Sequence, residues 1–425
     1  MGVSPFFLLS RFLVFCKIIG TEGVVFRYSI YKILRAKEKT VKRFIVFFIA
    51  ATQFGCPGFS NENNTNIQQT DLQGGSMRFQ DPLFPFPYNE EEVVFHNTPV
   101  NVTLSGTLTL PDSAGPFPAV ILLHGSAPLD RDSSMFGHKL FLVWADHLTK
   151  QGIAVLRFDK RSAGKSTGNY NNSTLEDFAD DALAAIEYLK NRKEINVQQI
   201  GLVGHSEGGM TALLASSKSS DIAFVLLMAS PCVNWEELIL TQEAALQRID
   251  GISEEIIAKN LNLRKQVFTI LKEEGNREIA EKKLRELLTK QLSKLTDSER
   301  QVAENYYGPL ESQIQFFNSA WFRYNFTYDP ANTLKQIKIP LLALNGELDF
   351  IVSSKQNLTR IKQALEEAGH KDHTVKELAK LNHAFQTCQT GSVTECANIE
   401  ETTAPVALNM MSEWILEKTR PFSES

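Results

Sequence analysis

The sequence predicts an α/β fold in which a mostly parallel central sheet is flanked by helices and interrupted by one helical insertion. Continuous apolar runs, such as FPAVILL at residues 117–123, are typical of strands that are buried on both faces of a sheet. Segments with helical spacing alternate with these runs up to about residue 231 and again from about residue 330. Because parallel strands need crossover connections, we expect both parts to contribute to one sheet.

A β-hairpin is expected ahead of this alternation, because residues 93–111 form two period-two runs around a turn. The clearest helix covers residues 173–192, where Ser173 and Glu176 form a capping-box pattern. The other expected elements are helices over residues 136–152, 207–218, 353–369 and 403–418, and strands over residues 153–161, 198–206, 222–230 and 337–350, with a last strand and loop over 373–385.

Residues 232–329 break the alternation, because they are charged, show helical spacing and contain no convincing strand. Active sites of open α/β sheets lie at the carboxyl ends of the strands, so a helical block inserted between two strands is expected to cap that edge. The expected boundaries are 1–56 for an N-terminal extension with an export signal, 57–88 for a flexible tether, 89–231 and 330–425 for the core, and 232–329 for the cap.

The N-terminal region has the three-part layout of an export signal. Lys42 and Arg43 precede an apolar run over residues 44–51, which is too short to span a bilayer, and small residues and Cys56 follow. Cys56 resembles the lipid-attachment cysteine of bacterial lipoproteins, although a free cysteine in a polar tail is the alternative. We therefore expect an exported bacterial protein, periplasmic or attached to the membrane by a lipid on Cys56, with translation starting near Val41.

Composition excludes several function classes. The chain has 425 residues and a net charge of −5, and no basic stripe is found beyond its first forty or so residues, so nucleic acid is not an expected partner. Its five cysteines form no CxxC pair, and neither a metal nor an organic cofactor is expected. Cys388 and Cys396 could pair in an oxidising compartment.

A candidate nucleophile lies in the segment from Gly204 to Gly208, GHSEG, which fits the G-x-S-x-G pattern of a nucleophile elbow. The segment joins a predicted buried strand to a predicted helix, which is the context that this turn requires. Ser206 would stand at the start of the helix, where developing negative charge is favoured.

A serine nucleophile needs a base, and the base needs an orienting acid. In this type of fold they follow the serine in the chain order acid, then histidine. Asp349 ends a predicted strand and His383 lies in a loop after the last one, so we expect the triad Ser206, Asp349 and His383; Glu347 is the alternative acid.

Two backbone N–H groups should hold the developing oxyanion. We expect one from Glu207, directly after the nucleophile, and the other from Ser126 or Ala127, in the loop that follows the strand over residues 117–123. Glu207 itself is most simply a first-turn acid of the helix, with the binding of a substrate amine as the alternative.

Four motifs, HGSAPLDRD, DKRSAGKS, GHSEGG and NGELD with LNH, occur in this order between Glu90 and Lys418. In them the chain resembles the α/β-hydrolase superfamily, and within it the cap-bearing bacterial serine esterases. The resemblance implies an α/β-hydrolase fold, a scaffold role for Arg131 between Asp130 and Asp132, and a similar role for Asp159 and Arg161, with substrate contact as the alternative for all five. Ala127 replaces the usual glycine, so a positive φ there would be strained.

The expected function is hydrolysis of a small carboxylic ester through an acyl-enzyme. An aminopeptidase or amidase on the same fold is the alternative, but it would need an acidic cap pocket that the sequence does not clearly place. From another class, an inactive hydrolase-like surface binding protein is the rival. Phe317, Trp321 and Phe322, within an aromatic stretch at the end of the cap, are expected to line the substrate pocket, with packing of the cap core as the alternative.

Overall fold

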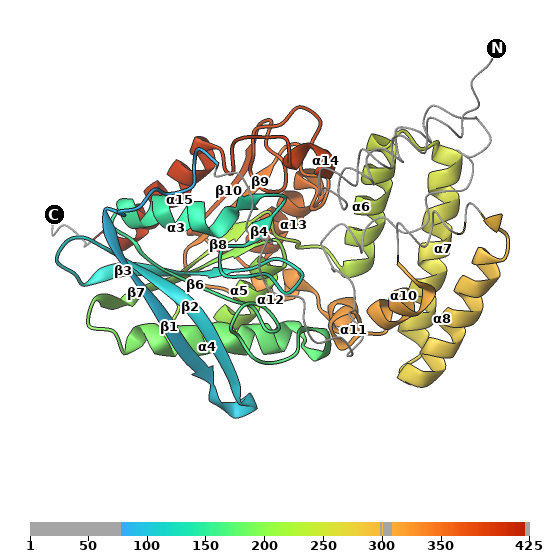
Figure 1. Ribbon diagram of the computed structural model, residues 1–425, viewed down its shortest axis with the longest axis horizontal. Helices are drawn as coiled ribbons and strands as arrows, with labels where there is room; N and C mark the ends of the chain where they lie inside the picture. Colours follow the sequence, from blue (N-terminus) through green and yellow to red (C-terminus); the bar gives the residue numbers. More distant parts are fainter. Residues whose placement is uncertain (1–77, 298–299, 301–307, 421–425) are drawn as a thin grey trace, which may run out of the picture.

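One sheet of eight strands forms the centre of the protein, in the order β1-β2-β6-β3-β7-β8-β9-β10 (Figure 1). The computed structural model describes residues 78–297, 300 and 308–420, so the expected export signal and Cys56 lie outside the described residues. Strand β2 pairs antiparallel with β1 and β6, and the strands from β6 to β10 are parallel to one another. The predicted fold class is therefore confirmed. The strands are β1 (Tyr88–Asn97), β2 (Val102–Pro111), β3 (Phe117–Leu123), β6 (Ala154–Phe158), β7 (Ile195–His205), β8 (Phe224–Met228), β9 (Leu341–Gly346) and β10 (His373–Leu378).

Helices cover both faces of the sheet, as the continuous apolar strands require. In β3, Ala119, Ile121 and Leu123 join one apolar cluster, whereas Val120 and Leu122 join the other. The second cluster is completed by α3 (Leu140–Lys150) and α15 (Pro405–Thr419). The first is completed by α4 (Leu175–Lys190), α5 (Glu207–Lys218), α12 (Pro330–Leu334) and α13 (Ser354–Glu367).

A group of helices between β8 and β9 lies beside the sheet rather than on either face (Figure 1). Helices α6, α7 and α8 pack in sequence order, and α11 contacts α4 of the core. Apolar side chains of α7, such as Leu263, Val267 and Phe268, belong to the same cluster as the core helices. We call this group the cap helices: α6 (Trp235–Ile249), α7 (Glu254–Glu273), α8 (Arg277–Leu292), α10 (Leu310–Phe317) and α11 (Ala320–Thr327).

Residues 78–88 differ from the expected flexible tether. The Arg78 guanidinium donates to the carbonyls of Ala397 and Ile399, at 2.9 and 2.8 Å, and the Gln80 side-chain amide donates to the Thr403 carbonyl at 2.8 Å. Because these side chains satisfy carbonyls of the core, the tether prediction does not hold for this part of the segment, and β1 begins at Tyr88.

Two helix starts also differ from expectation. The capping box of α4 uses Thr174 and Asp177, one residue later than predicted, because the Ser173 hydroxyl donates to the Asn169 carbonyl at 2.7 Å instead. Helix α3 begins at Leu140 rather than at residue 136, because residues 134–139 form the small ribbon of β4 (Ser134–Met135) and β5 (His138–Lys139).

The turn from β7 into α5 is packed so tightly that only glycine fits at two of its positions. A Cβ atom on Gly204 would lie 2.1 Å from the Gly208 carbonyl oxygen, and one on Gly208 would lie 2.0 Å from the Leu123 carbonyl oxygen. Both neighbours are backbone atoms, which cannot move without shifting a strand or a helix. These two glycines therefore bring α5 close enough to hold Ser206 against the end of the sheet.

We expect Gly208→Ala to lower the free energy of unfolding by roughly 2–4 kcal/mol, because its new methyl group would overlap the backbone at the end of β3. Gly275→Ala is the matched control, since nothing lies within 4 Å of a Cβ atom at that position and the change there should stay within about 1 kcal/mol. Urea unfolding of both variants measures the difference. Equal stability of the two would contradict the packing argument.

Candidate active site

Ser206 lies at the turn between β7 and α5 in a strained backbone conformation. Its φ is 56° and its ψ is −124°, values that cost a non-glycine residue on the order of 1–3 kcal/mol. The Ser206 N–H donates to the Met228 carbonyl at 2.9 Å, and the residue lines a cavity. The strained turn thus places Ser206 at this cavity and at the N-terminus of α5.

His383 and Asp349 meet although 34 positions separate them in the chain. The His383 Nδ1 atom lies 2.8 Å from Oδ2 of Asp349. The other carboxylate oxygen of Asp349 accepts the backbone N–H groups of Ile351 and Val352, at 2.9 and 2.8 Å. The Asp349 side chain is fully buried, so these donors fix its orientation and stabilise its charge.

Glu347, the alternative acid, does not contact His383. Its carboxylate accepts the backbone N–H of Lys380 at 2.9 Å, which ties the end of β9 to the loop before His383. Of the two candidates, the structure brings Asp349 to the imidazole.

His205 holds the His383 loop against the elbow. Its Nε2 lies 2.9 Å from the His383 carbonyl, and since a carbonyl only accepts, Nε2 carries the proton. The two imidazole rings are 4.8 Å apart between centroids. Burial, with a smaller contribution from His383, lowers the pKa of His205 to about 3, so this imidazole is neutral at physiological pH.

The candidate oxyanion donors differ in their surroundings. Ser126, Ala127 and Glu207 all line the cavity with Ser206. The Ala127 N–H, however, donates to the Tyr170 hydroxyl at 2.8 Å, and Ala127 has a positive φ, 96°, which is strained for a residue with a side chain. The Glu207 N–H opens α5, where a helix has no partner for it of its own.

A buried ion pair between Lys160 and Glu207 joins three segments around the cavity. The Lys160 Nζ atom donates to Oε1 of Glu207 at 2.7 Å and to the Gly125 carbonyl at 3.0 Å. The other carboxylate oxygen of Glu207 accepts from the Ser126 hydroxyl at 3.1 Å and from the Trp321 indole N–H at 2.6 Å. One carboxylate therefore connects the loop that follows β3, helix α5 and cap helix α11.

Neither Lys160 nor this role of Glu207 follows from the motifs. Lys160 stands between Asp159 and Arg161 in the DKRSAGKS motif. This position within a charged loop is the feature of the sequence that could have indicated a role for Lys160 in the site. Its ammonium group also lies 4.0 Å from the centre of the Phe178 ring. Because Glu207 already accepts three donors, its charge is compensated inside the protein.

Two arginines fix the loop that carries Lys160. The resemblance placed Arg131 between Asp130 and Asp132. In the structure, Arg131 forms no ion pair with either of these two residues. It binds Asp159 instead, at 2.9 Å between Nη2 and Oδ2, because its side chain runs toward β2 and the start of the loop.

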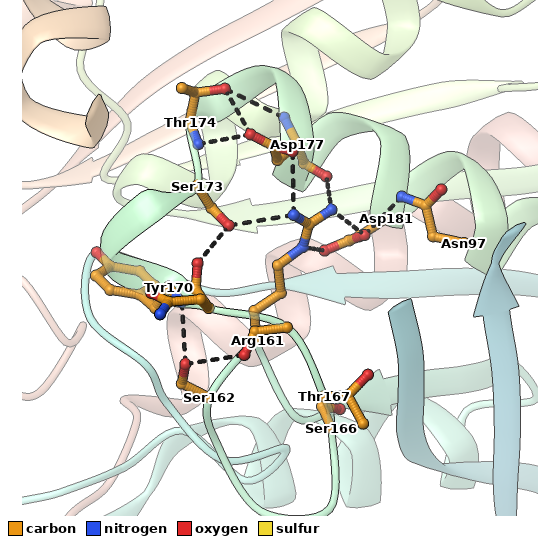
Figure 2. Close-up of polar contacts among 12 residues, drawn as sticks. Asn97, Arg161, Ser162, Ser166, Thr167, Tyr170, Ser173, Thr174, Asp177 and Asp181 are labelled. Carbon is orange, nitrogen blue, oxygen red and sulfur yellow. Dashed lines mark hydrogen bonds and ion pairs between the residues drawn. The ribbon is translucent and has the colours of Figure 1, made fainter. Parts of the chain in front are cut away.

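Arg161 points the other way, toward α4 (Figure 2). Its guanidinium donates to both carboxylate oxygens of Asp181, at 2.7 and 2.8 Å, and to Asp177 at 3.0 Å. The Ser162 hydroxyl accepts the Tyr170 N–H at 3.0 Å, which closes the loop (Figure 2). The loop is thereby held at both ends, on either side of Lys160.

The cavity beside Ser206 has a volume of about 70 Å³. All three aromatic residues expected in its wall, Phe317, Trp321 and Phe322, line it. The sequence did not indicate that α6 and α7 contribute side chains to the wall of this cavity. The apolar spacing of α6 is a signal that could have identified its buried face. The residues of this missed part of the wall are Trp235, Leu238, Ile239, Gln242, Glu243 and Arg264, together with Ile351 and Val352 after β9.

Cys388 and Cys396 are free thiols in the structure. The Cys396 sulfur accepts from the side-chain amide of Asn382, the residue directly before His383, at 3.5 Å.

Among the described residues, no group of three or more His, Cys, Asp or Glu side chains is arranged to hold a metal ion. No helix in the same part of the chain is both long and apolar enough to cross a membrane.

We expect Lys160→Met to lower the free energy of unfolding by about 3–5 kcal/mol, because it leaves the buried Glu207 carboxylate without a cation. The double variant Lys160→Met with Glu207→Gln should recover much of this loss, since no buried charge remains. Lys165→Met is the control, because that side chain is exposed and should change stability by less than about 0.5 kcal/mol. Urea unfolding compares the four proteins, and a double variant no more stable than the single one would refute the ion-pair account.

Acid should destabilise the protein through two buried histidines. Burial, and then Lys160, lowers the pKa of His124 to about 3, and His205 has a similarly low pKa. Both groups titrate near 6.5 in the unfolded chain, so the unfolded state binds more protons below that pH. Their contribution to stability is present above pH 6.5 and is lost as the pH falls toward about 3.

Each histidine should contribute a slope of up to about 1.4 kcal/mol per pH unit in this range. The free energy of unfolding, measured in urea at pH 7, 6 and 5, should fall with pH. His205→Gln, which keeps a donor near the His383 carbonyl, should show a slope smaller by about that amount. A variant with the wild-type slope would contradict the assignment.

Comparison with known proteins identifies a family for this chain. The family model described as serine aminopeptidase, S33, matches residues 118–387, which is more than half of the chain. Esterase EstD of Thermotoga maritima is 27% identical over 304 residues, covering 71% of this chain and 61% of that protein. Human dipeptidyl peptidase 8 is 27% identical over 165 residues, covering 36% of this chain and 18% of its own length. The chain thus spans less than two thirds of either relative.

Among solved structures, an esterase of Pyrococcus furiosus superposes with a TM-score of 0.44 at 19% identity, over 78% of this chain and 91% of its own. The match to the family model covers the sheet from β3, the elbow, the cap helices and the His383 loop. The chain belongs to the serine aminopeptidase S33 family of the α/β-hydrolase superfamily.

Proposed function

We propose that this protein hydrolyses carboxylic esters through an acyl-enzyme formed on Ser206. The observation that carries the proposal is the contact between His383 and Asp349, in a loop that His205 holds next to the strained Ser206, which lines a largely apolar cavity. The esterase activity named for the Thermotoga maritima relative supports it. A small apolar cavity suits an acyl group of an ester rather than a highly charged ligand.

In this mechanism His383 accepts the proton of the Ser206 hydroxyl as its oxygen attacks the ester carbonyl. Asp349 accepts the Nδ1 proton of His383, so the lone pair of the neutral imidazole is on Nε2. Asp349 also stabilises the imidazolium that forms. The tetrahedral intermediate collapses when His383 returns the proton to the leaving alcohol. Water then attacks the acyl-enzyme while His383 accepts its proton, and His383 gives that proton to the Ser206 oxygen as the acid leaves.

The oxyanion is assigned to the backbone N–H groups of Glu207 and Ser126. The Ala127 N–H is the weaker candidate of the loop pair, because it already donates to Tyr170. The Lys160 contact to the Gly125 carbonyl holds the loop that carries the Ser126 amide. Such donors lower the barrier because they are oriented before charge develops.

An aminopeptidase is the second candidate, because an acid lies where a substrate amine would need one. Glu243, an acid of the cap helix α6, lines the cavity, whereas the sequence placed no acidic cap pocket. Its carboxylate, however, lies 2.6 Å from Nε of Arg264, which also lines the cavity. Because the cation already neutralises Glu243 and Lys160 neutralises Glu207, neither acid offers an uncompensated charge to a substrate amine.

Ester hydrolysis is tested with p-nitrophenyl esters of increasing acyl length, beside amino-acid p-nitroanilides. We expect wild type to cleave esters and Ser206→Ala to lose activity by a factor on the order of 10⁴ or more. Asp349→Asn should lose a factor of about 10²–10⁴, because the imidazole loses its orienting acceptor. Glu347→Gln is the matched control and should retain activity, since Glu347 contacts Lys380 and not His383.

The outcomes separate the alternatives. Cleavage of anilides without cleavage of esters would favour the aminopeptidase. Ester hydrolysis at equal rates in wild type and Ser206→Ala would remove Ser206 from the mechanism. A folded protein without activity on either series, and without labelling by a serine-reactive phosphonate, would favour the inactive binding protein.

A further inference from the structure

Gln242 is a buried amide that faces the cavity without a partner. Its side chain lines the cavity and the residue is 6% exposed, yet its amide makes no hydrogen bond within the described part of the chain. A carboxamide has two N–H donors and an acceptor oxygen, and these atoms are not among the fully buried unsatisfied atoms of the described residues, so they stay accessible to an occupant of the cavity. Gln247, on the same helix, shows the usual outcome, because its oxygen accepts from Asn260 at 2.8 Å.

The neighbouring residue, Glu243, forms a buried ion pair with Arg264 across α6 and α7. Both residues are at most 2% exposed, and both line the cavity. The guanidinium also lies 4.8 Å from the centre of the Phe317 ring. A pair in contact has no net charge. Attraction of a substrate ammonium to Glu243 is therefore offset by its repulsion from Arg264, and attraction of a substrate carboxylate to Arg264 is offset by its repulsion from Glu243.

These three polar residues lie on the cap side of a wall that is otherwise largely apolar. They come from α6 and α7, which pack against each other in the cap (Figure 1). Ser126, Ser206 and Glu207 belong to the core side, and the Glu207 carboxylate is saturated by its three donors. The amide of Gln242 therefore offers hydrogen bonds to an occupant, beside the indole N–H of Trp235, which lines the same wall and has no partner among the described residues.

We propose that Gln242, beside the Glu243–Arg264 pair, forms a polar subsite that selects esters carrying an uncharged group able both to donate and to accept hydrogen bonds. A hydroxyl or a carboxamide on the part of the ester that occupies the cavity meets this requirement. A purely apolar chain leaves Gln242 unsatisfied, and a charged group gains nothing from a neutral pair. The subsite rests on the proposed ester hydrolysis and names its substrate class.

The test uses p-nitrophenyl esters of equal acyl length that differ only at the far end. The series is hexanoate, 6-hydroxyhexanoate, adipamate, 6-aminohexanoate and the adipate monoester, whose ends are methyl, hydroxyl, carboxamide, ammonium and carboxylate. We expect wild type to show a kcat/KM for the hydroxyl or carboxamide ester about three- to tenfold above that for hexanoate, the value of one neutral hydrogen bond. The two charged esters should fall below hexanoate.

Gln242→Met keeps the length of the side chain and removes its donors and acceptor. In this variant the ratio of kcat/KM for the hydroxyl or carboxamide ester to that for hexanoate should fall to about one. Gln266→Met, on the exposed face of α7, is the matched control and should keep the wild-type preference. A preference unchanged by Gln242→Met, or absent from active wild type, would overturn the subsite.

Failure of the proposed ester hydrolysis can be told apart from failure of the subsite. If the protein is not an esterase, no ester of the series would be cleaved in a manner that depends on Ser206. Binding of methyl 6-hydroxyhexanoate and methyl hexanoate to Ser206→Ala, measured by calorimetry, then decides the subsite alone. Tighter binding of the hydroxyl ester that Gln242→Met abolishes supports the subsite, and equal binding of the two overturns it.

Discussion

The buried ion pair of Lys160 and Glu207 is the interaction on which the arrangement of this site depends. Its two charges are almost completely removed from water, which is costly unless each is paired and further hydrogen-bonded. Gly125, Ser126 and Trp321 supply those further contacts. The same contacts connect the loop that follows β3, helix α5 and the cap. A displacement of any one of these segments would leave a buried charge unsatisfied.

Around this pair, the structure keeps strained and polar groups in place by packing them from several directions. Ser206 and Ala127 both have positive φ, and each is held by backbone or side-chain hydrogen bonds from distant segments. Arg131 and Arg161 fix opposite ends of the Lys160 loop through Asp159 and Asp181. Strain of this kind persists only where its surroundings over-determine the backbone, and the site has such surroundings.

The division between core and cap corresponds to a division of chemical tasks. The core side of the cavity holds Ser206 and the proposed oxyanion donors Ser126 and Glu207, and their positions follow from the ends of β3 and β7. The cap side holds aromatic residues and the polar cluster of α6 and α7, which would decide what the cavity accepts. Because the cap joins the core through Trp321 and Glu207, the cap side of the cavity wall and the turn that carries Ser206 are physically connected.

The sequence by itself determined the fold class, the elbow and the order of the candidate triad, because local patterns specify them: apolar runs, helical spacing and a glycine turn between a strand and a helix. It also indicated the aromatic wall of the cavity. Only the tertiary structure decided that Asp349 rather than Glu347 reaches His383, that Tyr170 occupies the Ala127 amide, and that Lys160 and Gln242 face the site. Periodicity shows which face of an element is buried, but the partner that it meets, such as Glu207 for Trp321 at a separation of 114 positions, is set by packing.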